Sequence, residues 1–323
     1  MESRKILCYD ESMQMKKCPF LNLCGGCKYD FTAESYRGEK LSLLPNLNYT
    51  HDAIWGKAGN RRRADFAFVD GRFGFFKKQS KDIIDINNCP NLTDEINDIL
   101  PYVAKLPWMG AGSILITACK NGIDIVVDSV VPHFNAEFKT AVEKLPPQII
   151  RFVWNDKVVR KYAEPEIKFN DKVLKYPPRA FLQPTIETEQ ILRDLVVKYV
   201  DGATKVADLF CGLGNFTYAT GATGFDIFGN GVNRDLFKKP LLVKQLNNYD
   251  VVIMDPPRNG AEKQSKELSK SNVKKIVYVS CNPKTFVRDK EMLEQGGYKM
   301  TVAIPVDQFV GSAHWEIFSV FEK

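Results

Sequence analysis

Residues 206–216 read VADLFCGLGNF, and this stretch decides how the second half of the chain folds. The apolar residues at its start predict a short buried strand. Gly212 and Gly214 allow the backbone to turn sharply after that strand and to approach a ligand closely, and the helix expected next offers unpaired N–H groups. The stretch alone fits a plain tight turn as well as a ligand-binding loop, so the choice depends on the residues around it.

Strands and helices alternate around this glycine turn. Apolar residues recur at helical spacing in three segments, 185–199, 261–270 and 284–295. Short apolar runs predict strands at 206–210, 223–227, 250–254, 274–280, 298–306 and 315–321. Strands separated by helices predict an α/β fold with a mainly parallel, doubly wound, Rossmann-like sheet, to which the last two strands can add an antiparallel edge.

The first half of the chain alternates with period 2 instead. Asp70-Gly71 and Asn121-Gly122 are strong hairpin signals, each between two strand-like runs. With further strands at 149–154 and 158–163, they predict an antiparallel β-rich central domain that ends near Tyr176-Pro177-Pro178. The expected units are an N-terminal region over 1–57 and 87–95, the central domain over 58–178 and the C-terminal domain over 179–323.

Composition excludes several classes of protein. The 323 residues suit two domains, and 44% hydrophobic with 26% charged residues is ordinary for a globular protein. No run approaches the ~20 apolar residues that cross a bilayer, and residues 1–20 lack the apolar core of a signal peptide, so we expect a cytoplasmic protein without a membrane partner. The net charge of +6 permits a polyanionic partner. Eight cysteines in such a protein indicate metal binding or catalysis rather than disulfides.

Polar side chains follow three of the predicted strands. Asp226 ends the strand after the glycine turn, where it can accept hydrogen bonds from the ribose of S-adenosylmethionine (SAM) or of a dinucleotide. Asp255 and Cys281 follow the next two strands, and we expect them to lie together because parallel strands end at one edge of a sheet. The helix expected after Cys281 lowers a thiol pKa and favours a nucleophile, whereas a buried cysteine there would be an inert apolar residue.

A thiolate and a carboxylate base are what methylation at carbon 5 of a uracil requires. Glu316, at the start of the last predicted strand, supplies such a carboxylate. Carbon 5 becomes nucleophilic only after a thiolate adds to carbon 6, and a base must then remove the carbon-5 proton so that the thiolate can leave. Two related chemistries are disfavoured. Enzymes that methylate exocyclic amino groups usually carry an aromatic residue where this chain has Arg258, and RNA cytosine-C5 enzymes usually carry a cysteine where it has Pro257.

Six short motifs follow one another along the chain, and their order and spacing can be compared with those of known families. They are Cys18-x5-Cys24-Gly25-Gly26-Cys27, Phe181-Leu182-Gln183-Pro184, DLFCGLGNF, DPPR, SCNP and HWE. In order and spacing they resemble the iron–sulfur-containing RNA uracil-C5 methyltransferases over nearly the whole chain. The likeness is greatest to the bacterial 23S ribosomal RNA enzymes that lack an N-terminal OB-type domain.

The resemblance implies a function and a set of site residues. It implies SAM-dependent formation of 5-methyluridine in 23S ribosomal RNA, through a covalent cysteine adduct at uracil carbon 6. In this reading Cys281 is the nucleophile and Glu316 is the base that removes the proton. The residues implied to contact SAM are Gln183, Phe210, Asn215, Asp226 and Asp255.

The cysteines near the N-terminus predict a metal site. Their close spacing brings three sulfurs together, and Gly25-Gly26 lets the backbone fold tightly between them, which suits a tetrathiolate site for zinc or for an iron–sulfur cluster. The resemblance implies a 4Fe–4S cluster, and its four ligands would be Cys18, Cys24, Cys27 and Cys89. We expect Cys8 and Cys119 to be free and Cys211 to pack inside the glycine turn.

Ribosomal RNA is the expected partner of a monomer that needs no other protein. Arg61, Arg62 and Arg63 and the basic hairpin after them are predicted to contact phosphate, while the hairpin phenylalanines 73, 75 and 76 either join that surface or pack in the core. In the short segment 227–249, Asp235 can supply a polar contact to adenine.

Three other functions stay open from the sequence. A transfer-RNA uracil methyltransferase is disfavoured by the cysteine triplet, which those relatives usually lack. An iron–sulfur RNA-binding protein without catalysis is disfavoured by the presence of Cys281, Glu316 and Asp255. A dinucleotide oxidoreductase would leave Cys281 and Glu316 without a role.

Overall fold

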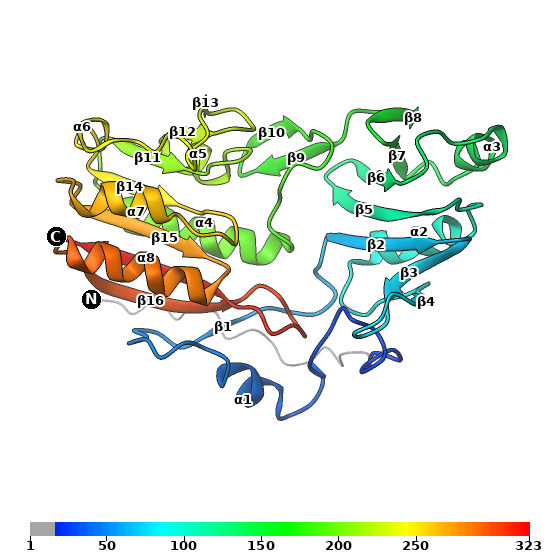
Figure 1. The fold of residues 1–323 in the computed structure, drawn as a ribbon, viewed down its shortest axis with the longest axis horizontal. Helices are drawn as coiled ribbons and strands as arrows, with labels where there is room; N and C mark the ends of the chain where they lie inside the picture. Colours follow the sequence, from blue (N-terminus) through cyan, green and yellow to red (C-terminus); the bar gives the residue numbers. More distant parts are fainter. Residues whose placement is uncertain (1–16) are drawn as a thin grey trace.

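The computed structural model describes residues 17–323, so the expected free Cys8 lies outside the described residues. Figure 1 shows two sheets side by side, with the segment between the cysteine loops and the first strand running along the lower side of both. In this described part, no helix is long and apolar enough to cross a membrane.

The C-terminal half folds around the predicted parallel sheet. Across residues 17–323, eight strands join it in the order β1-β16-β17-β15-β14-β11-β12-β13. The strands are β1 (Ile54–Trp55), β11 (Val206–Leu209), β12 (Thr223–Asp226), β13 (Val232–Asn233), β14 (Val251–Met254), β15 (Lys275–Ser280), β16 (Lys299–Asp307) and β17 (Glu316–Glu322). The helices of this half are α4 (Ile186–Val200), α5 (Asn215–Thr220), α6 (Val243–Leu246), α7 (Glu262–Ser269) and α8 (Pro283–Gln295).

Helices cover both faces of this sheet, which is why its central strands are apolar throughout. Along β14, Val251 and Ile253 face the cluster that holds α4 and α5, while Val252 and Met254 face the cluster that holds α7 and α8. Successive side chains of a strand point to opposite faces, so a strand buried on both sides reads as a continuous apolar run. The doubly wound fold is confirmed.

The last two strands add the expected antiparallel pair on one side of the sheet, in the order β15-β17-β16. β17 is not at an edge but between β15 and β16, antiparallel to both. β1, from the N-terminal region, pairs parallel with β16 and extends the sheet further. This insertion has a consequence for the site, because the register pairs Ser280 with Ile317 and so brings residue 281 opposite residue 316.

The β-rich half forms a separate sheet over a single large core. Its order within the described chain is β4-β3-β2-β5-β6-β7-β8. The bounds are β2 (Arg63–Val69), β3 (Arg72–Phe76), β4 (Ile83–Asp85), β5 (Ala111–Cys119), β6 (Gly122–Ser129), β7 (Ile149–Trp154) and β8 (Lys157–Lys161). The other elements are β9 (Glu166–Phe169), β10 (Lys172–Lys175), α1 (Tyr36–Leu41), α2 (Asp94–Val103) and α3 (Ala136–Glu143).

Both predicted hairpins are confirmed, but the prediction of a wholly antiparallel sheet is wrong at one pair. β6 and β7 are parallel. The physical reason is the connection between them, since α3 crosses over the sheet and returns the chain in the same direction. The core of this half contains Trp108 and Trp154, which stack with ring centroids 6.5 Å apart.

Candidate active site and cysteine cluster

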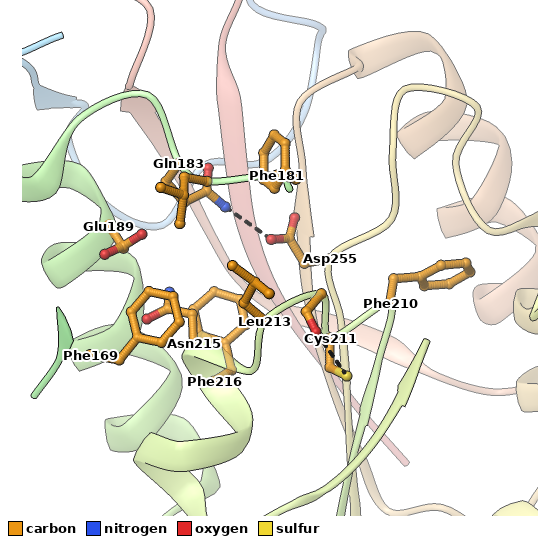
Figure 2. A pocket seen from close by; sticks show the side chains of 12 residues that line it. Phe169, Phe181, Gln183, Glu189, Phe210, Cys211, Leu213, Asn215, Phe216 and Asp255 are labelled. Atoms are coloured by element: carbon orange, nitrogen blue, oxygen red, sulfur yellow. Dashed lines mark hydrogen bonds between the residues drawn. The ribbon is translucent and has the colours of Figure 1, made fainter. Parts of the chain in front are cut away.

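A hollow at the carboxyl ends of β11 and β14 contains most of the residues expected to bind SAM. It is open to solvent and has an empty volume of about 420 Å³. It is lined by Phe169, Phe181, Leu182, Gln183, Glu189, Phe210, Cys211, Gly212, Leu213, Asn215, Phe216 and Asp255. In Figure 2, Gln183 and Asp255 face one another, while Phe210 points away from Asn215.

The glycine turn adopts a backbone conformation that favours glycine, in agreement with its sequence. Gly214 precedes α5 with φ of +93°, a left-handed conformation that a side chain would strain, and an added Cβ would lie 2.9 Å from the Tyr218 ring. The turn therefore requires glycine at this position and directs the start of α5 toward the hollow.

Asn215 carries a free hydrogen-bond donor into the hollow. Its Oδ1 accepts a 2.7 Å hydrogen bond from Arg193 Nε, which fixes the orientation of the amide. Its Nδ2 is buried and has no partner among residues 17–323. A buried donor without a partner costs free energy unless a ligand accepts from it, so Asn215 is placed to bind an acceptor group.

Asp226 lies behind the glycine turn rather than in the lining of the hollow. Its carboxylate accepts hydrogen bonds from the backbone N–H of Gly212, at 3.0 Å, and of Phe228, at 2.9 Å. Asp226 therefore holds the turn and the next loop together. Asp235 similarly accepts from the backbone N–H groups of Phe237 and Lys238 and caps a local turn.

Asp255 ends β14 and is hydrogen bonded to Gln183, whose Nε2 donates to its Oδ2 at 3.0 Å. Although the residue as a whole is partly exposed, its carboxyl group is desolvated, and this raises its pKa to about 8. The charge of nearby Asp208 acts in the same direction, and the hydrogen bond from Gln183 acts against it. Asp255 and the Gln183 amide form the floor of the hollow, whereas Asp208 is buried and does not line it.

Cys281 and Glu316 lie beside this floor, on neighbouring strands. Cys281 follows β15 and is partly exposed, and Glu316 opens β17 and is only 2% exposed. Oε2 of Glu316 accepts a 2.9 Å hydrogen bond from Gln308 Nε2, while its Oε1 is buried without a partner in the described chain. Burial raises the pKa of Glu316 well above its ordinary range, and the charge of Asp255 adds to the rise.

The expectation that the following helix lowers the Cys281 pKa is wrong for the substrate-free protein. The thiol pKa is raised to about 12, and burial is the largest cause. The charges of Glu316 and Asp255 add to the rise, while the charge of Arg258 opposes it. Cys281 precedes Asn282, the N-cap of α8, whose side chain accepts from the Lys284 N–H. Burial, together with the charges of the two carboxylates, therefore outweighs the effect of the helix end on the thiol pKa.

Alkylation tests this pKa directly. In the RNA-free protein, we expect Cys281 to react slowly with iodoacetamide at pH 7. Because its pKa is about 12 instead of the ordinary 9.0, the rate should rise about tenfold per unit from pH 7 to 10. Mass spectrometry of the Cys281 peptide measures the rate, and a synthetic peptide of residues 276–286 is the control. A plateau near pH 8 in the folded protein would contradict the raised pKa.

The four predicted cluster cysteines come together from separate parts of the chain. Burial raises the pKa of Cys27 to about 12, with further contributions from Cys89, Cys18 and Cys24. Burial also raises the pKa of Cys89, and Cys18 and Cys24 add to it. The Cys24 loop pairs with the end of β3, since Gly25 N–H donates to Phe76 O. Even so, residues 17–323 show no group of three or more histidine, cysteine or acidic side chains arranged to hold a metal ion.

The prediction that Arg62 contacts phosphate is wrong. Arg62 is 5% exposed, and its guanidinium donates to Glu189 Oε2 at 2.5 Å and to Gln183 O at 3.1 Å. It is an internal cation that supports the hollow. Of the hairpin phenylalanines, Phe73 and Phe75 pack in the core, where each stacks on Phe66, while Phe76 is 43% exposed.

Three residues of the site were missed by sequence reasoning. Asp208 is buried beside the glycine turn and accepts from Thr217 Oγ1 at 2.6 Å. Arg193 orients Asn215, and Gln308 contacts Glu316. Asp208 could have been found from its place in the DLFCGLGNF stretch, whereas Arg193 and Gln308 carry no local signal because their partners lie on other elements, which only folding brings beside them.

Comparisons with known proteins agree with this geometry. The family described as tRNA (uracil-5-)-methyltransferase matches residues 234–323. An uncharacterized RNA methyltransferase of Brucella melitensis is 33% identical, with 96% of this chain and 85% of the relative covered. The 23S rRNA (uracil(1939)-C(5))-methyltransferase of Vibrio vulnificus is 26% identical, with 95% of this chain and 82% of the relative covered.

A solved structure shares the fold. Pyrococcus abyssi tRNA (uracil-54, C5)-methyltransferase in complex with S-adenosyl-L-homocysteine superposes with a TM-score of 0.69 at 19% identity, with 89% of this chain and 82% of that chain covered. At this identity the likeness concerns the fold, and it extends over both sheets because it covers most of each chain.

Proposed function

This chain belongs to the SAM-dependent RNA uracil-5-methyltransferases, and we propose that it methylates one uridine of 23S ribosomal RNA through a covalent adduct with Cys281. The observation that carries the proposal is the pairing of β15 with β17, which sets Cys281 opposite Glu316 beside the hollow. A nucleophile and a base on adjoining strands can act on the same pyrimidine ring.

The residues of the hollow fit SAM. The unpartnered Nδ2 of Asn215 suits the carboxylate of an amino acid, and Asp255 and Gln183 offer further polar atoms from the opposite side. We propose that Gln183, Phe210, Asn215, Asp226 and Asp255 hold SAM, with Asp226 acting partly through the glycine turn that it braces. Bound there, SAM supplies an electrophilic methyl group.

The chain's own side chains would carry the remaining chemistry. The Cys281 thiol loses its proton to water and its sulfur adds to uracil carbon 6, which makes carbon 5 an enolate carbon. Carbon 5 would then take the methyl group, and the electron pair of the broken S–CH₃ bond would stay on the sulfur of the donor as a neutral thioether. Glu316 removes the proton from carbon 5 through its unpartnered Oε1, and the electrons of that C–H bond expel the Cys281 thiolate. The base finally returns its proton to water.

Mapping of 5-methyluridine tests the substrate. We expect ribosomal RNA from cells that lack this protein to lose the modification at one uridine of 23S RNA, and re-expression to restore it. The cysteine triplet and the 23S relative from Vibrio vulnificus support this choice. The family and structure named for transfer RNA support the alternative, and loss of the modification only in transfer RNA would establish that alternative.

We propose that Cys18, Cys24, Cys27 and Cys89 hold a 4Fe–4S cluster. The thiols are close enough to raise one another's pKa, and four thiolates suit an iron–sulfur cluster as they suit zinc. The cysteine motif and its likeness to the iron–sulfur-containing enzymes favour the cluster. The cluster would fix the cysteine loops to β3 and to the segment that carries Cys89.

Metal analysis tests the cluster. Protein isolated without oxygen should be brown and contain about four irons per chain. We expect Cys89→Ser to lose the iron and to lower the Tm, because this ligand ties the cysteine triplet to the β-rich half. Cys119→Ser, at a free cysteine elsewhere in that half, is the control and should keep both iron and Tm. A colourless protein with one tightly bound zinc would contradict the cluster.

We propose that residues 58–178 take part in RNA binding, beside a cluster region at 1–57 and 87–95 and a catalytic domain at 179–323. Phe76 is exposed near Lys78, so a base could stack there while the ammonium group contacts phosphate. We also propose that the protein acts as a monomer in the cytoplasm, where its RNA substrate is made.

A further inference from the structure

Gln308 is a buried amide between the two carboxylates of the site. It follows β16 and is 2% exposed. Its Nε2 donates to Gln183 Oε1 at 2.7 Å and to Glu316 Oε2 at 2.9 Å. Gln183 in turn donates to Asp255 at 3.0 Å. Two amides thus connect the carboxylate beneath the SAM hollow with the carboxylate opposite Cys281.

The direction of every hydrogen bond in this connection is determined. Gln308 Oε1 accepts from Thr188 Oγ1 at 3.1 Å, so both hydrogens of its Nε2 are free to donate to Gln183 and Glu316. The reversed amide would set its oxygen against two acceptors, Gln183 Oε1 and Glu316 Oε2, and would leave them without donors. Thr188 lies in the first turn of α4, whose N-cap Thr185 accepts from the Thr188 N–H.

The loop that carries Gln308 is held from several sides. Lys40 Nζ donates to Phe309 O and Asn91 Nδ2 donates to Val310 O, both at 2.9 Å. The N–H of Gly311 donates to the hydroxyl of Tyr36 at 3.0 Å. These contacts come from two separate segments of the chain, α1 and the loop that carries Asn91, so the position of the Gln308 amide is fixed by tertiary structure.

This arrangement selects the oxygen of Glu316 that can take a proton. Oε2 is occupied by Gln308, whereas Oε1 is buried and unpartnered among the described residues. A carboxylate that is held by one oxygen keeps its second oxygen in a fixed direction. A fixed direction of the accepting oxygen raises the rate of proton transfer.

We propose that Gln308 is a positioning residue, which holds Glu316 for proton removal and couples this base to the SAM hollow through Gln183 and Asp255. The inference rests on the proposed function, because Glu316 acts there as the base. Gln308 itself touches neither the methyl donor nor the uracil in this assignment. Its removal should therefore slow elimination more than it slows methyl transfer.

Gln308→Met keeps the size of the side chain and removes its hydrogen bonds. With RNA and methyl-labelled SAM in single turnover, we expect the methyl group to reach the RNA within about threefold of the wild-type rate. The labelled covalent adduct should then decay about 10- to 100-fold more slowly, because a hydrogen bond to a charged group has been lost. SAM affinity, measured by calorimetry without RNA, should weaken several-fold through Gln183.

The pH profile of adduct decay distinguishes a positioning role of Gln308 from a general loss of protein stability. A donated hydrogen bond favours the charged carboxylate, so its loss raises the pKa of Glu316, and decay should need a higher pH than in the wild type. Asp255 and Cys281 are the other titratable groups that face this carboxylate, and both are unchanged in the variant. A merely destabilised protein would keep the wild-type profile.

Gln264→Met is the matched control. Gln264 is 1% exposed, and its amide both donates to and accepts from the backbone of Leu241, away from the hollow. We expect this variant to lose stability without any change in adduct decay. Should Gln308→Met fail to fold, Gln308→Glu keeps size and polarity but lacks the amide hydrogens, and it should also accumulate adduct.

The outcomes are distinguishable. If Glu316→Gln traps an adduct but Gln308→Met clears it at the wild-type rate, the positioning role is overturned and the proposed function stands. If Gln264→Met slows decay equally, the effect is one of stability and the positioning role is again overturned. If Glu316→Gln forms no adduct at all, the covalent mechanism and the inference built on it both fail.

Discussion

Cys281→Ala is expected to lower methyl transfer to RNA by at least ~10⁴-fold, because carbon 5 of uracil cannot become an enolate without addition of sulfur at carbon 6. The variant should bind SAM as the wild type does, since Cys281 is not among the residues that line the hollow. Single-turnover transfer of a labelled methyl group measures the first effect, and calorimetry with SAM measures the second.

Cys119→Ala is the control for this substitution. Cys119 is also a partly exposed thiol whose pKa is raised to about 12, but it lies at the end of β5 in the other sheet. The Cys119→Ala protein should transfer methyl groups at the wild-type rate. Wild-type turnover by the Cys281→Ala protein would exclude a covalent mechanism and would leave Glu316 and Asp255 as the groups to examine.

Glu316→Gln is expected to accumulate a methylated covalent protein–RNA adduct and to slow turnover by about 10²- to 10⁴-fold. Addition of Cys281 and methyl transfer do not need the carboxylate, whereas removal of the carbon-5 proton does. Without that removal, the C5–H electrons cannot expel the thiolate. The adduct should migrate as a slow, labelled band on a denaturing gel and should be absent in the double variant with Cys281→Ala.

Glu322→Gln provides the matched control on the same strand. Glu322 lies at the far end of β17, where it pairs with Lys275 at 3.2 Å, near the surface. The same chemical change there should leave adduct decay unaltered. An adduct that clears normally in Glu316→Gln would remove Glu316 from the base role and would direct attention to Asp255, whose pKa of about 8 also suits proton transfer.

Local signals in the sequence were sufficient for the elements of the catalytic half. The strands at 250–254 and 274–280 were predicted to within one residue of β14 and β15. Such strands are buried on both faces, so they are apolar throughout and are bounded by polar residues and turns. The same signals located Asp255 and Cys281 at strand ends, because the carboxyl edge of a parallel sheet follows from chain order alone.

The partners of these residues could not be predicted in the same way. Glu316 faces Cys281 because β17 inserts between β15 and β16, and nothing in residues 315–321 distinguishes an edge strand from an internal one. The pKa of Cys281 also depends on that insertion, since burial raises this pKa and the charge of Glu316 on β17 raises it further.

The sequence by itself determined the α/β class, the glycine turn and the hairpins, because each of these depends on neighbours within a few residues. Only the tertiary structure decided that Arg62 is an internal cation and that Gln308 connects Gln183 with Glu316. The contacts of these two side chains span more than 100 residues or join separate elements. Their energies come from burial and from paired hydrogen bonds, which exist only once these separate elements have packed together.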